Sequence, residues 1–106
     1  MPRYLIVGTY TADGARGVLK EGGTRRAAAA QAAIASMGGR LVAFHFALGI
    51  DEWYSIVDLP DNAAAAAIAM VGTASGTLRS RAIALITPEE MDAITARTPD
   101  FRPPGE

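Results

Sequence analysis

The residues with the clearest capacity for chemistry gather in the segment GRLVAFHFALGIDEWYSIV, residues 39–57. This segment contains the only histidine of the chain, His45, and soon after it the carboxylate pair Asp51 and Glu52. An imidazole titrates near neutral pH and serves as a general acid or base, a proton shuttle or a metal ligand. His45 is therefore the first candidate for a catalytic residue, with Asp51 and Glu52 as candidate acid/base groups at the mouth of a pocket.

Each of these candidates also has a structural interpretation. A histidine in a strand-like run also occurs as a hydrogen-bonded group at a subunit interface. A carboxylate pair in a turn is expected for backbone reasons alone, because Asp favours turns. The residue types leave both interpretations open for His45 and for the carboxylate pair.

Aromatic side chains provide candidate walls for a pocket. Tyr4, Tyr10 and Trp53 all lie in or beside strand-like segments. Ligand pockets are mostly apolar, with a few polar groups that orient the ligand. We expect these three residues to contact a small planar or aromatic metabolite, with His45 as the acid/base group.

Arg79 and Arg81 lie two residues apart on a predicted strand and so share one face of it. Paired arginines hold a carboxylate or phosphate of a ligand. In the alternative, they belong to an exposed or edge segment and pair with Asp58 or Glu21. Their face also carries the apolar Ile83 and Leu85, so we expect a bulge near Arg81 that switches the faces of the strand.

Other chemistry is weakly indicated. Four glycines and four basic residues alternate in segment 14–26, but the glycine spacing matches neither a P-loop nor a dinucleotide fingerprint. We interpret the basic residues as a solvated surface. The chain has no cysteine and one histidine, which gives no recognisable metal-ligand spacing. We predict no metal site.

Composition limits the class of protein. The 106 residues suffice for one domain, 50% of them are hydrophobic, and the formal net charge is −1. This charge offers no general attraction to nucleic acid or anionic membranes. The longest apolar run, Ala63–Val71, is far shorter than the roughly 20 residues that span a bilayer, and the first residues lack a signal-peptide pattern. We expect a cytoplasmic protein.

Turn and capping residues divide the chain into alternating strands and helices. Gly22-Gly23 should interrupt the first helix, and Gly38-Gly39 should end its second part. Thr11, Asp61 and Thr87 stand where helices should begin. The predicted strands are residues 4–10, 40–48, 52–59 and 77–86, and the predicted helices are residues 11–37 in two parts, 63–73 and a short one from 87.

This order predicts an α+β ferredoxin-like βαββαβ sandwich, a four-stranded antiparallel sheet with helices on one face. In the second strand, Val42, Phe44, Phe46 and Leu48 should face the helices, and Leu41, Ala43, His45 and Ala47 the other side. Since that side is also mostly apolar, we expect a homodimer or higher homo-oligomer of the dimeric α/β-barrel type, with sheets packed face to face.

Several longer stretches carry a resemblance to a known family. MPRYLIVGTYTADGARGVLKEGGTRR, GGRLVAFHFALG, IVDLPDNAAAAAIAM and SGTLRSRAIALITPEEM together resemble the GYD domain family, small bacterial proteins related to the dimeric α/β-barrel superfamily. The similarity covers nearly all of residues 1–95, including the glycine break of the first helix and the Thr87-Pro88-Glu89-Glu90 cap. The resemblance implies the same ferredoxin-like fold and no particular activity.

The chain departs from the family at its signature. The family's Gly, any residue, Tyr, Asp reads Gly49-Ile50-Asp51-Glu52 here, so the tyrosine is absent. No cofactor is predicted from the residues. Haem is compatible with a single axial histidine, and its binding elsewhere in the superfamily is the only support for it here.

Two functions from different classes follow. The first is a small enzyme or binding protein for a planar metabolite, with small residues such as Gly8 and Ser55 leaving room near His45 if they share its face. The second is a non-catalytic oligomeric module in which His45 stabilises the interface. We expect the domain to comprise residues 1–96 and a proline-rich tail residues 97–106.

Overall fold

The computed structural model describes all residues from Met1 to Glu106. Its elements follow the chain in the order β1 (Arg3–Tyr10), α1 (Ala12–Glu21), α2 (Gly23–Ser36), β2 (Arg40–Phe46), β3 (Trp53–Asp58), α3 (Asn62–Ala74), β4 (Leu78–Leu85) and α4 (Pro88–Thr95).

The helices begin at the residues whose side chains the sequence offers as caps. The Thr11 side chain accepts a hydrogen bond from the Gly14 backbone N–H, and the Asp61 side chain accepts one from the Ala64 N–H. Such caps satisfy backbone donors that lack a partner in the first helical turn. The break between α1 and α2 falls at Gly22, whose φ of 84° is open to glycine and strained for other residues.

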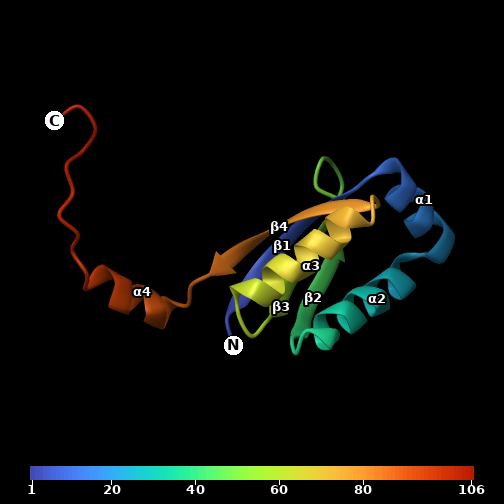
Figure 1. Cartoon of the computed structure of the whole chain (residues 1–106), viewed down its shortest axis with the longest axis horizontal. Helices are drawn as coiled ribbons and strands as arrows, with labels where there is room; N and C mark the ends of the chain where they lie inside the picture. Colours follow the sequence, from blue (N-terminus) through green and yellow to red (C-terminus); the bar gives the residue numbers. More distant parts are fainter.

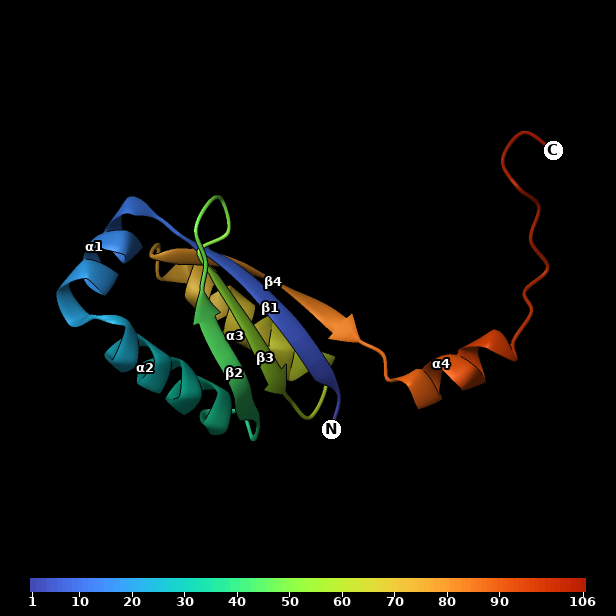
Figure 2. The ribbon, with the colours of Figure 1, turned by 180° about the vertical axis from the view of Figure 1, so that it is seen from behind.

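The four strands form one antiparallel sheet in the order β2-β3-β1-β4. Helix α3 lies across one face of this sheet, and α2 lies along the same side near β2 (Figure 1). Seen from behind, the opposite face has no helix over it (Figure 2). We call this second face the open face. The arrangement is the α+β ferredoxin-like fold that the element order predicts.

The core lies between the sheet and the helices. Tyr4 and Ile6 of β1 pack with Val57 and Leu59, which are fully buried, and with Ile34 of α2. Ala64 and Ala65 of α3 complete the cluster. Their small side chains let α3 approach the sheet closely, as the alanine-rich sequence of this helix indicates.

The prediction for Leu41 is wrong. Leu41 pairs with Val57 and packs against the core, so it faces the helices and not the open face. The pairing then skips Val42, and Ala43 pairs with Ile56. This β-bulge puts two residues of β2 opposite one of β3, so the alternation of faces that we applied to the whole strand holds only from Ala43 onward.

The bulge predicted near Arg81 is also absent. β4 pairs with β1 without a register shift, from Arg3 opposite Leu85 to Tyr10 opposite Leu78. Arg79 and Arg81 therefore share the open face with Ile83 and Leu85. An edge strand tolerates a face with both charged and apolar side chains, because one side of the strand borders solvent.

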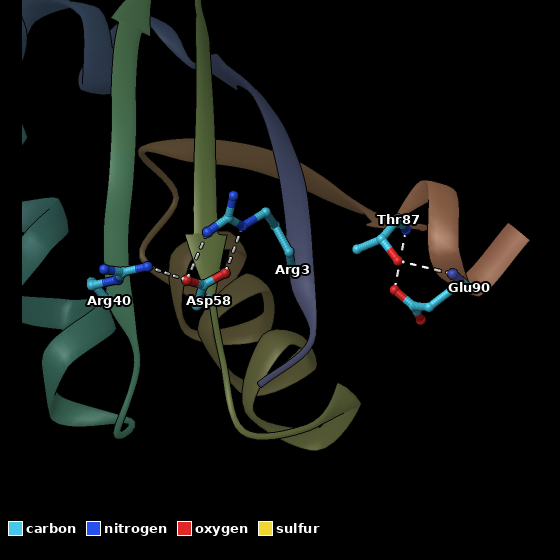
Figure 3. A network of polar contacts seen from close by, with 5 residues as sticks. All are labelled: Arg3, Arg40, Asp58, Thr87 and Glu90. Atoms are coloured by element: carbon cyan, nitrogen blue, oxygen red, sulfur yellow. Dashed lines mark hydrogen bonds and ion pairs between the residues drawn. The ribbon is translucent and has the colours of Figure 1, made fainter.

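Beyond β4, the chain leaves the body of the fold. α4 and the residues after it project away from the sheet (Figures 1 and 2), and residues 86–106, which we call the arm, are exposed throughout. The cap of α4 forms as predicted: Thr87 and Glu90 exchange side-chain to backbone hydrogen bonds of 3.0 and 3.1 Å (Figure 3). None of the helices is both long and apolar enough to cross a membrane.

Candidate ligand-binding site

A cavity of about 430 Å³ lies between the helix-covered face of the sheet and the helices α2 and α3. Its buried floor comes from Ile6 of β1, Ile34 of α2, and Trp53 and Ser55 of β3. Exposed side chains at the end of α2 and on α3, among them Met37 and Val71, form its rim. The cavity is thus partly enclosed, open on the helix side, and of a size that suits a small organic ligand.

Small residues on the two helices make this space. Ala30 and Ala33 of α2, with Ala67 and Gly72 of α3, line the cavity where longer side chains would fill it. The alanine-rich sequence therefore has two effects. It lets α3 pack closely on the sheet, and it leaves room between α2 and α3.

One wall of the cavity is aromatic. The rings of Tyr10 and Trp53 stack with their centroids 4.6 Å apart and their planes tilted by 35°. Trp53 pairs with Gly8 across the strands, and its indole occupies the position where a side chain on Gly8 would lie. Such an aromatic pair offers a surface to a planar ligand.

The polar groups of the cavity are few and distinct. Arg26 at the start of α2 is the only charged residue that lines it. Its guanidinium lies 4.0 Å from the Glu21 carboxylate, beyond hydrogen-bond distance, and both side chains are about one third exposed. The other polar residues of the lining carry hydroxyls, namely Tyr10, Ser36, Ser55, Ser75, Thr77 and Ser80.

Tyr10 connects the aromatic and charged parts of the site. Burial raises the pKa of its phenol, the Arg26 charge acts against this shift, and Glu21 and Glu52 add to it. The hydroxyl therefore stays protonated at neutral pH and can donate a hydrogen bond. Tyr10 and Arg26 also line a smaller adjoining cavity of about 120 Å³, which has Asp13 and Glu21 in its wall.

The residues proposed from the sequence fall into four places, namely the cavity wall, the core, the loop between β2 and β3, and the open face. Tyr10 and Trp53 lie together in the cavity wall. Tyr4 is buried in the core below, where its hydroxyl donates a hydrogen bond of 2.6 Å to the side-chain oxygen of Asn62. The structure therefore separates Tyr4 from the other two aromatic residues that we grouped with it.

The carboxylates Asp51 and Glu52 lie in the loop between β2 and β3. The Tyr54 hydroxyl donates a long hydrogen bond of 3.4 Å to Asp51. Glu52 accepts one of 3.3 Å from the backbone N–H of Tyr10. Neither lines the main cavity, although Glu52 lies close enough to affect the Tyr10 phenol.

His45 lies on the open face, away from the cavity. It pairs with Tyr54, which pairs with Val7, which in turn pairs with Arg81, so these four residues form one row across the sheet. His45 is exposed and lines neither cavity. An acid/base role for His45 would therefore concern the open face, and haem at this histidine would need an enclosure that neither cavity provides.

The small residues considered near His45 do not all share its face. Gly8 and Ser55 pair with Trp53 and Ile6 on the helix-covered face. Of the residues considered, Ala43 shares the open face with His45. Gly8 and Ser55 therefore leave no room beside His45.

A network of arginines and one aspartate occupies the end of the open face (Figure 3). Arg3 binds both oxygens of Asp58, at 2.8 and 3.1 Å, and Arg40 binds one of them at 2.8 Å. The hydrogen bonds from Arg3 and Arg40 hold the pKa of the Asp58 carboxyl well below its usual range. The alternative for Arg79 and Arg81 is correct in placing them on an exposed edge strand. The pairing with Asp58 or Glu21 is wrong, because Asp58 binds Arg3 and Arg40, and the cation near Glu21 is Arg26.

Arg26 is the main residue that the sequence analysis missed. It was assigned to a solvated basic surface, with its neighbours in segment 16–26. A usable signal was present, because Arg26, Ala30, Ile34 and Met37 follow helical spacing, so that Arg26 begins the inward stripe of α2.

No three His, Cys, Asp or Glu side chains gather closely enough to hold a metal ion. A comparison with curated proteins and one with solved structures found no match. The family model of the GYD domain matches residues 4–95, which span all four strands and end at the last residue of α4. This match covers far more than half of the chain, and the protein therefore belongs to the GYD domain family.

Proposed function

We propose that this protein binds a small planar organic molecule in the cavity between the sheet and the helices α2 and α3. The observation that carries the proposal is the stacked pair Tyr10 and Trp53 in the wall of a partly enclosed, mostly apolar space of about 430 Å³. Apolar pockets with a few oriented polar groups are the usual form of small-molecule sites.

The shape of the aromatic wall supports a flat ligand. The Trp53 indole lies over Gly8, which removes the side chain that would otherwise displace the ring. A planar molecule placed against Tyr10 and Trp53 gains both buried apolar area and an aromatic contact. The free hydroxyls of Ser55 and Ser80 supply hydrogen bonds that orient it.

The single tryptophan makes this proposal directly testable. Trp53 gives one indole N–H signal in a proton–nitrogen NMR spectrum, and a ligand in the cavity should shift that signal. We expect members of a set of planar bicyclic compounds to shift it in a saturable manner. A set that leaves the indole signal unchanged at all concentrations would argue against the cavity as a ligand site.

A matched pair of variants locates the binding. Ala30→Phe fills the cavity from α2, and Ala29→Phe places the same side chain on a neighbouring residue that is exposed and does not line the cavity. Ala30→Phe should abolish binding, whereas Ala29→Phe should retain it. Binding that survives in both folded variants would place the ligand elsewhere.

We also propose, as a second candidate function, that the chain assembles with a second copy through the open face. The row Ala43, Ile56, Leu5 and Ile83 is apolar across the whole sheet, and Ile83 is 38% exposed. Burial of such a face against a second copy removes apolar surface from water.

The charges of the arm support the same assembly. The arm carries five acidic side chains and two basic ones, namely Glu89, Glu90, Asp92, Asp100 and Glu106 against Arg97 and Arg102. The open face presents Arg79 and Arg81 without ion-pair partners in the chain. An arm that reaches the open face of a second copy would bring opposite charges together and cover the exposed Met91 and Ile94.

Sedimentation velocity over a range of concentrations tests this assembly. We expect a dimer that Ile83→Lys dissociates, because it puts a charge at the β4 end of the apolar row, on a side chain that is 38% exposed in the single chain. Ala66→Lys, on an exposed position of α3, is the matched control and should leave the dimer intact. A wild-type protein that stays monomeric at the highest concentration would exclude this function.

A further inference from the structure

The charge of the residues that line the cavity indicates which charge its ligand should carry. Among the 19 residues that line it, Arg26 is the only charged one, and none is acidic. A neutral ligand that covers this guanidinium would remove water from a cation without replacing its hydrogen bonds, which is unfavourable. An anionic group on the ligand would restore those bonds and neutralise the charge.

The donors of Arg26 are free to make such bonds. Its guanidinium makes no hydrogen bond within the chain, and the contact with Glu21 is 4.0 Å long. A guanidinium carries five N–H donors in a planar fork that matches a carboxylate in two parallel hydrogen bonds. The loose contact with Glu21 leaves these donors available to a ligand.

Tyr10 places the anionic group relative to the ring of the ligand. Its ring stacks on Trp53 in the aromatic wall, and Tyr10 and Arg26 together line both the main cavity and the smaller one. A ligand that stacks on this wall therefore brings a substituent on its ring close to Arg26 and to the Tyr10 hydroxyl. The hydroxyl is protonated and adds a second kind of donor for an anion.

The site favours one negative charge over two. Arg26 is the only cation in the cavity wall, and Glu21 lies near it on the side of the smaller cavity. A phosphate would bring a second negative charge that no further cation balances, and Glu21 would repel it. A carboxylate matches both the single charge and the planar fork.

We infer that the natural ligand is a planar aromatic carboxylate, with its ring on Tyr10 and Trp53 and its carboxylate on Arg26. This inference rests on the proposed binding function of the same cavity. It assigns Arg26 the role of a specificity-determining residue, which selects the acid over the corresponding neutral compound.

The test compares 2-naphthoate with 2-naphthamide, which has nearly the same shape but no charge, by isothermal titration calorimetry on the full chain. The wild type should bind the acid about 10- to 100-fold more tightly, as expected for charge-assisted hydrogen bonds. Arg26→Met should remove this preference while it keeps the apolar stem. Arg25→Met, at an exposed neighbour outside the cavity, should preserve it.

Glu21→Gln provides a variant with the opposite expected effect. It removes the carboxylate beside Arg26 and should tighten the binding of 2-naphthoate by several fold. Because this variant gains affinity, it tests the role of Arg26 even if Arg26→Met does not fold. Equal binding of acid and amide by the wild type, with a shifted Trp53 indole signal, would overturn this inference and leave the cavity as a ligand site. Failure of both compounds and of the wider planar set to shift that signal would instead overturn the proposed function.

Discussion

The indole of Trp53 takes the space of a side chain on Gly8. A β-carbon added to Gly8 would lie 1.9 Å from the Trp53 ring, far inside contact distance. The two residues pair directly across β1 and β3, so the glycine is required for the indole to lie on the sheet and form the aromatic wall of the cavity.

Gly8→Ala should therefore destabilise the protein and move Trp53. Forcing an extra methyl group into a packed site costs about 1–3 kcal/mol, which lowers the thermal midpoint by several degrees in a chain of this size. Thermal unfolding and the Trp53 indole N–H signal measure the two effects. Gly17→Ala is the control, because its β-carbon meets no atom within 4 Å and a helix gains from alanine, so its midpoint should stay the same or rise. Equal midpoints for Gly8→Ala and the wild type would contradict the packing described.

The network at Asp58 predicts how stability depends on acidity. The pKa of Asp58 is depressed in the folded chain, so the unfolded chain takes up this proton more readily. The stabilisation is complete above about pH 4, the usual value for an unfolded aspartate, and is lost progressively as the pH falls below it. Asp58→Asn should lower the urea concentration at the unfolding midpoint at pH 7. Between about pH 4 and pH 2, this midpoint should fall less steeply in Asp58→Asn than in the wild type.

Urea unfolding at a series of pH values checks this dependence. Asp100→Asn, in the exposed arm, is a control that should keep the wild-type profile. A steep decline below pH 4 that is identical in Asp58→Asn and the wild type would assign the acid sensitivity to other carboxylates.

The Thr87 cap predicts a local effect on α4. Thr87→Ala removes a cap of about 1 kcal/mol from a helix of eight residues, which is marginal by itself. In dilute solution, we expect lower helical circular dichroism and an unchanged thermal midpoint, because α4 lies apart from the body of its own chain (Figure 2). Where the chain dimerises, the same change should weaken the dimer.

Thr11→Ala offers the contrast for this experiment. Its hydroxyl caps α1 and donates a hydrogen bond of 2.7 Å to the Gly76 carbonyl, so it links α1 to the start of β4. This change should lower the global midpoint. A fall of the midpoint in dilute Thr87→Ala would mean that α4 contacts the body of its own chain.

The packing of the core predicts a large loss of stability when Leu59 is truncated. This side chain is fully buried against Tyr4, Val57 and Ile34. Leu59→Ala should destabilise the fold by about 2–5 kcal/mol, because it removes buried methyl groups and leaves a cavity. Leu19→Ala, at a residue that is 86% exposed, should change stability by no more than about 0.5 kcal/mol. Equilibrium unfolding in urea measures both, and similar values for the two variants would show that the core is misassigned.

The sequence predicts most of the fold because its signals are local. Caps at Thr11, Asp61 and Thr87 and the break at Gly22 each depend on a few neighbouring residues, and all four occur as expected. The face of His45 was also predictable, because alternation holds in the part of β2 that follows the bulge.

The errors come from features that local patterns do not specify. Two adjacent apolar residues, Leu41 and Val42, fit either face, so nothing in the pattern located the bulge. The cavity depends on how far α2 and α3 lie apart over the sheet, which is a tertiary property. The role of Arg26 follows from that separation, and a basic residue among other basic residues fits a solvated surface equally well.

The bulge in β2 also affects how the sequences of relatives should be aligned. Val42 has no partner in the pairing of β2 with β3, so a chain that lacks this one residue would still place Leu41 in the core and Arg40 beside Asp58. Within the GYD domain family, a one-residue gap opposite Val42 is thus structurally silent. A gap one residue wide in the middle of β1 or β3 would exchange the two faces of the sheet beyond it.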